Sequence, residues 1–113
     1  MTTSIALPPP DAFFEVPGMR GLRVAHLGAA DGKTLEIIEA VEGVVIPHLV
    51  TRANERGRVL SGKIRFHQGD SSRILAEGDT WELGANAPHG PHIFLAATQL
   101  AILRDGPGAF DPQ

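Results

Sequence analysis

The sequence predicts an all-β fold, either a barrel or a sandwich of two sheets, on two observations. The 13 glycines and 9 prolines of the 113-residue chain recur between short apolar runs and do not gather in one linker. That spacing is typical of strands joined by turns, because both residues interrupt helices. Within the runs, apolar and polar residues alternate: Ile64 and Phe66 share one face, while Lys63 and Arg65 share the other. A period of two indicates a half-buried strand.

Nine strands are expected in the runs between these turns. The first, at residues 22–27, alternates and places His26 on the same face as Leu22. Residues 34–41 include good helix formers, but the segment is short and lies between Gly32 and Gly43, so a strand is favoured over a helix. The other strands are expected at residues 44–51, 58–60, 63–67, 72–75, 80–83, 91–96 and 99–103.

Turn residues and alternation support the later strands. Gly62 separates residues 58–60 from residues 63–67, and the turn-forming sequence at 68–70 precedes the next strand. Trp81 and Leu83 then share one face of residues 80–83 and are expected to point into the core or to form the apolar wall of a pocket.

The length allows a single domain. A chain of 113 residues is close to the size of one typical domain, so residues 1–113 are expected to form one unit. Its core is expected at about residues 20–104. A proline-rich arm at residues 1–17 precedes the core, and a loose tail at residues 105–113 follows it.

Composition excludes several functions. The formal net charge of −3, with no excess of Lys and Arg over Asp and Glu, argues against nucleic acid or an anionic membrane as a partner. No cysteine is present, which excludes disulfides, thiolate metal sites and cysteine nucleophiles. There is no secretory signal and no run of about 20 apolar residues that could cross a membrane. We therefore expect a cytoplasmic protein.

Three side chains could hold a metal ion inside such a barrel. His48 follows an apolar strand, Glu55 opens the next polar stretch, and His89 ends a segment that begins at Gly78. A barrel can bring distant strands to one interior point, so two imidazoles and a carboxylate could meet around a cation. This ligand set suits Fe(II), and Mn, Ni or Zn also fit it.

The spacing of these residues resembles the two sequence motifs of the cupin superfamily, over about residues 43–94. The first motif reads G-x5-H-x-H-x3,4-E-x6-G, and His48, Glu55 and Gly62 match it. The second reads G-x5-P-x-G-x2-H-x3-N, and Gly78 and His89 match it. The resemblance implies a double-stranded β-helix, or jelly-roll, barrel in which His48, Glu55 and His89 are metal ligands.

The chain departs from both motifs. Val50 takes the place of the second histidine and is expected to point where a metal bond would form, and Gly43 stands one residue too close to His48. Ile93 replaces the final asparagine of the second motif. His92 could substitute as a ligand, but its offset of three from His89 points it to the opposite face unless residues 90–91 form a bulge. In the second motif, Gly84 and Asn86 replace the proline and the glycine.

Two further residues have alternative interpretations. Gly57 shares the face of Glu55 and either leaves space near the metal or marks a bend in the strand. His26 is expected to be a structural histidine with a hydrogen-bond partner, or an interface residue.

The function hypothesis is a cupin-like barrel that binds a divalent metal and acts on or binds a small organic molecule. As an enzyme it would be of the dioxygenase, isomerase or lyase type. The alternatives are a non-catalytic small-molecule-binding or sensor barrel, and a metal-free degenerate cupin. A homodimer is expected by family analogy, since small barrels commonly cover exposed sheet edges by pairing.

Overall fold

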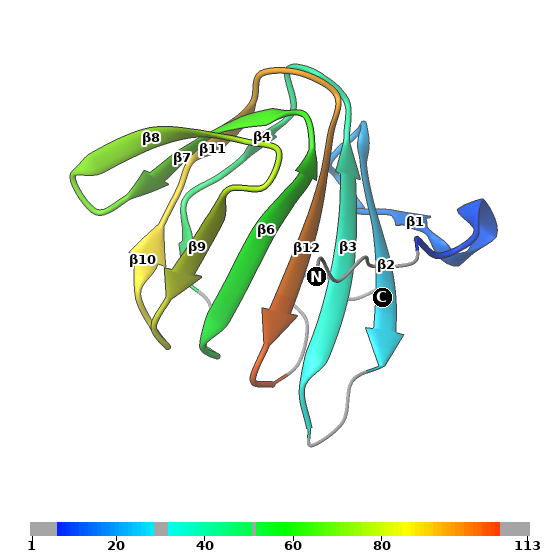
Figure 1. Cartoon of the computed structure of the whole chain (residues 1–113), viewed down its shortest axis with the longest axis horizontal. Helices are drawn as coiled ribbons and strands as arrows, with labels where there is room; N and C mark the ends of the chain where they lie inside the picture. Colours follow the sequence, from blue (N-terminus) through cyan, green and yellow to red (C-terminus); the bar gives the residue numbers. More distant parts are fainter. Residues whose placement is uncertain (1–6, 29–31, 51, 107–113) are drawn as a thin grey trace.

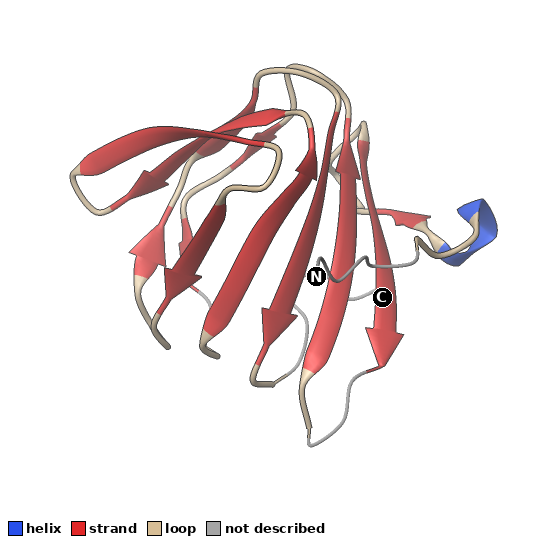
Figure 2. Cartoon of the chain, viewed as in Figure 1, coloured by secondary structure: helices blue, strands red, loops and turns tan. Residues whose placement is uncertain are grey.

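The computed structural model of the chain describes residues 7–28, 32–50 and 52–106. Residues 1–6 of the predicted arm and residues 107–113 of the predicted tail therefore lie outside the described residues. Thr51, at the end of the strand expected at 44–51, lies outside them as well. Figure 2 shows strands throughout the described chain, preceded by one short 3-10 helix. The elements are η1 (Pro10–Ala12), β1 (Phe14–Glu15), β2 (Leu22–Gly28), β3 (Thr34–Ala40), β4 (Val45–Ile46), β5 (Leu49–Val50), β6 (Glu55–Ser61), β7 (Lys63–Gln68), β8 (Ser71–Ala76), β9 (Thr80–Leu83), β10 (Pro88–His89), β11 (His92–Phe94) and β12 (Thr98–Arg104).

The strands form two antiparallel sheets that face each other (Figure 1). The first sheet has the order β1-β2-β3-β12-β6-β9. The second has the order β4-β11-β7-β10-β5, and β8 also pairs with β7. The last strand, β12, lies between β3 and β6, so segments far apart in the sequence become neighbours at the centre of the first sheet. The prediction of an all-β fold is confirmed.

The expected strands are present, but β1 and β10 were not expected, and the strand expected at 58–60 begins at Glu55 as β6. Residues 34–40 form β3, so the strand that was favoured over a helix is confirmed. The strand expected at 44–51 is divided into β4 and β5, and the strand expected at 91–96 is shortened to β11, with β10 as a separate strand before it. Both of these differences lie in the second sheet and shape the interior.

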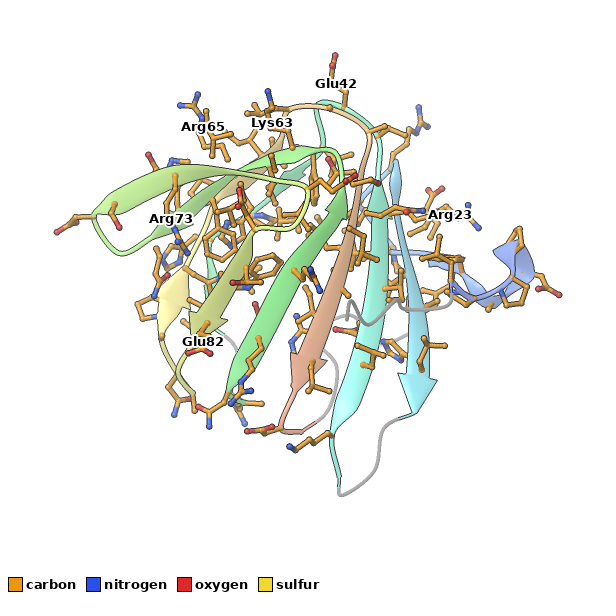
Figure 3. The ribbon with its side chains drawn as sticks, in the orientation of Figure 1. Arg23, Glu42, Lys63, Arg65, Arg73 and Glu82 are labelled. Atoms are coloured by element: carbon orange, nitrogen blue, oxygen red, sulfur yellow. The ribbon has the colours of Figure 1, made fainter. Side chains whose placement is uncertain are left out.

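The core fills the space between the two sheets and follows the predicted alternation. On β7, Ile64 and Phe66 are buried, while Lys63 and Arg65 are exposed and project away from the sheets (Figure 3). Burial of such apolar surface contributes roughly 25 cal/mol per Å² to folding. The core cluster consists of Val16, Leu22, Val24, Ile38, Ala40, Ile46, Val59, Ile64, Phe66, Leu75, Trp81, Leu83, Phe94, Leu100 and Ile102.

The described part of the N-terminal arm is attached to the first sheet. β1 pairs with β2, and the guanidinium of Arg23 donates a hydrogen bond of 2.8 Å to the carbonyl oxygen of Pro10. The ring of Phe14 contacts His26 edge-on at 5.5 Å between centroids. Strand pairing, a hydrogen bond and a ring contact therefore hold residues 10–15 against the first sheet. Among the described residues no helix has the length and apolar character needed to cross a membrane.

Candidate functional site

A two-residue interruption, Gly90 and Pro91, separates β10 from β11 and leaves both His89 and His92 buried. In an unbroken strand, residues three apart point to opposite faces. The interruption supplies the irregularity that brings His92 back to the same side, which is the exception that the sequence left open for a bulge at residues 90–91. Gly90 has a φ of +98°, and a Cβ added there would lie 2.9 Å from the carbonyl oxygen of Pro47. Glycine is required by both features.

A matching interruption, Pro47 and His48, separates β4 from β5 in the adjacent strand. Ile46 is buried, and Leu49, three residues later, also lines the interior. Val50 is 52% exposed, and His48 is exposed as well. The expectation that Val50 points into the metal site is therefore wrong, because the interruption shifts the alternation by one residue. Leu49 takes the interior position.

Hydrogen bonds connect three histidines, His67, His92 and His89, in the second sheet. The backbone N–H of His67 donates to Nδ1 of His92 at 3.3 Å, and a hydrogen bond of 2.8 Å joins Nε2 of His92 to Nδ1 of His89. The ring of Phe66 stacks on His92 at 4.1 Å between centroids. Nε2 of His89 is buried and has no hydrogen-bond partner among the described residues. An unsatisfied buried polar atom costs about 1–3 kcal/mol, so it indicates a place where a ligand or water binds.

Burial keeps both interior imidazoles neutral at neutral pH. Desolvation, with a smaller effect from the charges of His89 and His67, lowers the pKa of His92 from 6.5 to about 3. Desolvation also lowers the pKa of His89, and the charge of His48 adds to the effect. His48 is thus near His89 although its side chain is exposed.

Glu55 and Arg104 form a buried ion pair on the first sheet. The two residues are direct partners in the pairing of β6 with β12. Oε1 of Glu55 accepts a hydrogen bond from Nε of Arg104 at 3.2 Å and lies 3.1 Å from Nη2, while Oε2 accepts one from Nε1 of Trp81 at 2.8 Å. Burial raises the pKa of Glu55, and the bond from Trp81 opposes that rise. Burial lowers the pKa of Arg104 to about 10, which leaves the guanidinium charged at neutral pH.

The ion pair is the centre of a longer polar row across the first sheet. Arg104 forms a second ion pair with the fully buried Glu36 on β3. Oε2 of Glu36 is 2.7 Å from Nε2 of His26 on β2. Polar side chains of β2, β3, β12, β6 and β9 thus contact one another in sequence. The interpretation of His26 as a structural histidine with a hydrogen-bond partner is confirmed.

A small interior cavity of about 20 Å³ lies between the histidines and the ion pair. A space of this size accommodates about one water molecule or one ligand oxygen. Among the described residues that line the cavity, Leu49 alone is half-buried and the others are buried, so the cavity is nearest the surface there. The lining residues are Ile38, Ile46, Leu49, Glu55, Ile64, Phe66, Trp81, His89, His92, Leu100, Ile102 and Arg104.

Solved structures share this arrangement of strands. KdgF from a Halomonas species superposes with a TM-score of 0.74 at 13% identity, over 84% of this chain and 88% of its own. An RmlC-like cupin from Shewanella frigidimarina gives 0.74 at 16% identity, over 92% and 93%. An acetylacetone dioxygenase from Acinetobacter johnsonii gives 0.76 at 12% identity, over 100% and 80%. The chain has the cupin fold. At these identities the likeness shows the cupin fold alone.

The likeness of this cupin barrel to known proteins is found in the structures and not in the sequence. No protein-family model matches it, and no curated protein matches it. The double-stranded β-helix predicted from the two motifs is nevertheless confirmed by the superposed structures.

The residues of this cupin barrel do not fit the metal site that the motifs imply. His48 is exposed, and both carboxylate oxygens of Glu55 accept hydrogen bonds from Arg104 and Trp81. The guanidinium beside Glu55 would also repel a cation. Nowhere in the described parts of the chain do three His, Cys, Asp or Glu side chains form a group that could hold a metal ion. The structure does not assemble His48, Glu55 and His89 into one ligand set.

Gly57 leaves no open space beside Glu55. It is paired with Trp81 across β6 and β9, and a Cβ added to Gly57 would lie 1.9 Å from the indole ring. The interpretation of Gly57 as room near a metal is therefore wrong, because the indole occupies that room. The absence of a side chain lets Trp81 cross the strand and reach Glu55.

The sequence analysis missed the buried Arg104 and the polar contact of Trp81. Arg104 continues the alternation of Leu100 and Ile102 on β12, and that phase would have predicted a buried arginine. Its carboxylate partner could not be predicted, since Glu55 lies 49 residues away in the sequence. Trp81 was placed in the core, but its hydrogen bond to Glu55 was not expected.

Proposed function

We propose that this cupin barrel binds a small organic molecule in its interior through hydrogen bonds, without a metal ion held by His48, Glu55 and His89. The second of the hypotheses drawn from the sequence, a small-molecule-binding barrel, is thus favoured over the metal-dependent enzyme. A homodimer remains part of the proposal, by analogy with other small barrels.

One observation carries this proposal: the buried, unpartnered Nε2 of His89 belongs to a residue that lines the interior cavity. Ligand sites typically combine an apolar wall with a few convergent polar groups. Here the wall is formed by residues such as Ile64, Phe66 and Leu100, and the polar groups are two histidines and the Glu55–Arg104 pair. The ion pair satisfies itself, so His89 is the group with a hydrogen bond to offer.

The similar solved structures support a small-molecule role without specifying it. One is the acetylacetone dioxygenase, and a further similar structure, at 22% identity over 80% of this chain and 50% of its own, is a DMSP lyase. Those activities belong to those proteins, since one fold supports many chemistries. For this chain they support only that the ligand is a small molecule.

The experiment combines metal analysis with ligand screening on the untagged protein. We expect Fe, Mn, Ni and Zn to be far below one equivalent, both as purified and after incubation with each ion followed by desalting. We expect some members of a library of small ketones, amides, acids and alcohols to raise the melting temperature and to change the fluorescence of Trp81, the single tryptophan, which lines the cavity.

Variants identify the site. The ligand response should persist in His48→Ala, which changes an exposed residue, and should be lost in His89→Phe. His89→Gln retains a donor and should keep part of the response. One equivalent of tightly bound metal, lost in both Glu55→Gln and His89→Gln, would overturn the proposal in favour of the metal-dependent enzyme. A barrel that responds to no compound would overturn it in favour of the degenerate cupin.

A further inference from the structure

The backbone N–H of His67 fixes which atoms donate and which accept in the hydrogen bonds that join His67, His92 and His89. The donor to Nδ1 of His92 is the backbone N–H of His67, at 3.3 Å. A backbone amide nitrogen can donate a hydrogen bond but cannot accept one. Nδ1 of His92 is therefore an unprotonated acceptor, and the neutral ring carries its proton on Nε2.

This direction passes to the second ring. Nε2 of His92 is 2.8 Å from Nδ1 of His89 and, as the protonated nitrogen, donates to it. Nδ1 of His89 is then the acceptor, and the proton of the neutral His89 ring lies on Nε2. The opposite arrangement would place an N–H of His92 against the N–H of His67. One peptide group thus sets the tautomer of both imidazoles.

Nε2 of His89 is therefore a buried hydrogen-bond donor without an acceptor among the described residues. Nε2 of His89 is the buried nitrogen that lacks a partner, and in this tautomer it carries a hydrogen and has no lone pair to offer. A metal ion needs a lone pair at the ligating nitrogen. The atom that satisfies Nε2 of His89 is instead a hydrogen-bond acceptor, such as an oxygen.

Charge in the interior disfavours an anion as the source of that oxygen. Arg104 is paired with both Glu55 and Glu36, so its positive charge is already matched by two carboxylates. His89 and His92 are neutral. An anionic ligand would lose its hydration and gain no free positive charge in return, which is unfavourable. A neutral acceptor avoids that cost.

We infer that the interior recognises a neutral molecule by its carbonyl oxygen, which accepts a hydrogen bond from Nε2 of His89, and that the molecule enters beside Leu49. The inference rests on the proposed function and specifies the class of ligand. The cavity of about 20 Å³ holds the oxygen and little more. The rest of the ligand needs the space of Leu49, the partly exposed side chain on the two-residue strand β5.

The tautomer is tested without any ligand. Long-range ¹H–¹⁵N correlation spectra of the histidine rings distinguish a ring protonated at Nε2 from one protonated at Nδ1. We expect both His89 and His92 to be neutral and protonated at Nε2, and the spectrum of His89→Gln to assign the signals. A proton on Nδ1 of His89 would overturn the inference while leaving the proposed function intact.

The ligand class is tested with three probes of one shape: cyclopentanone, cyclopentanecarboxylate and cyclopentylammonium. Binding is followed by Trp81 fluorescence in the wild type and in Leu49→Ala. We expect cyclopentanone to bind best, and to bind more tightly to Leu49→Ala, because the smaller side chain opens the cavity. His89→Phe should weaken its binding by about tenfold, the equivalent of one hydrogen bond, and His89→Gln by less.

The outcomes separate the two proposals. Preference for the carboxylate or the ammonium ion would overturn the neutral-carbonyl assignment but would still support an interior binding site. Equal binding of cyclopentanone to the wild type and Leu49→Ala would overturn the entry route. If no probe and no library compound changes the fluorescence of either protein, the cavity holds only an undisplaced water and both proposals fail.

Discussion

Arg104 and Glu55 face each other across β12 and β6 inside the barrel, with Nη2 of the guanidinium 3.1 Å from Oε1 of the carboxylate. Both side chains are 3% exposed. Because Arg104 also pairs with Glu36, it holds two buried carboxylates at once. The pairing explains why Glu55, which matches a metal-ligand position of the cupin motif, is bonded within the protein.

Arg104→Met is expected to destabilise the protein strongly. The substitution leaves Glu36 and Glu55 buried without their cation, and loss of one partner from a buried ion pair costs about 3–5 kcal/mol. The control is Arg56→Met, which breaks the exposed pair with Glu82 and should cost no more than about 1 kcal/mol. Urea denaturation measures the free energy of unfolding of each variant. Equal losses in the two variants would contradict the role assigned to Arg104.

Gly57→Ala is expected to displace the indole of Trp81. The added Cβ would lie 1.9 Å from the ring, so Trp81 must move and lose its hydrogen bond to Glu55. Overpacking of this kind costs about 1–3 kcal/mol, and the fluorescence spectrum of the single tryptophan should change. Gly84→Ala is the control, since a Cβ there meets no atom within 4 Å. An unchanged spectrum in Gly57→Ala would show that the indole does not occupy this position.

The faces of the regular strands could be predicted from the sequence. Alternation is a local property, and it correctly placed Ile64 and Phe66, and also Trp81 and Leu83, inside the barrel. Within these strands every residue pairs in register, so nothing shifts the period of two.

The geometry of the site could not be predicted in the same way. His92 faces inward and Val50 faces outward because strands are interrupted at residues 47–48 and 90–91, opposite each other in the second sheet. A proline in the sequence indicates that a strand can be interrupted there, but it does not indicate how many residues are left unpaired with the neighbouring strand. That number depends on the partner strand, which is remote in the sequence. A match to a motif therefore placed Val50 on the wrong side.

Acid is expected to destabilise the barrel through His92. Its pKa is near 6.5 in the unfolded chain and is lowered to about 3 by burial in the folded state. Below pH 6.5 the unfolded state therefore binds a proton that the folded state does not, and stability falls as the pH falls towards 3. Between about pH 6.5 and about pH 5 the loss from His92 is about 2 kcal/mol, and His89, whose pKa is also lowered, adds to it.

Glu55 acts in the opposite direction over part of this range. Burial raises its pKa above 4.5, so the folded state takes up that proton first as the pH falls, which offsets part of the loss. Comparison of variants isolates the histidine. Urea denaturation at about pH 7.5 and about pH 5 should show a smaller difference for His92→Gln than for the wild type. Ile74→Gln, which changes an exposed and uncharged side chain, should keep the wild-type difference. A pH dependence unchanged in His92→Gln would refute the assignment.

Val50→His restores the histidine that the first cupin motif lacks, and it is expected not to restore an interior metal site. Val50 is 52% exposed and Leu49 holds the interior position, so the new imidazole lies on the outside of the barrel. Any Zn²⁺ or Ni²⁺ that the variant binds should depend on the added histidine and not on Glu55 or His89. Calorimetric titration of Val50→His with and without Glu55→Gln measures this dependence, and Val50→Leu controls for the change at the surface. Tight metal binding that Glu55→Gln abolishes would mean that the alternation of β5 resumes in the inward phase and that Glu55 can leave Arg104 for a cation.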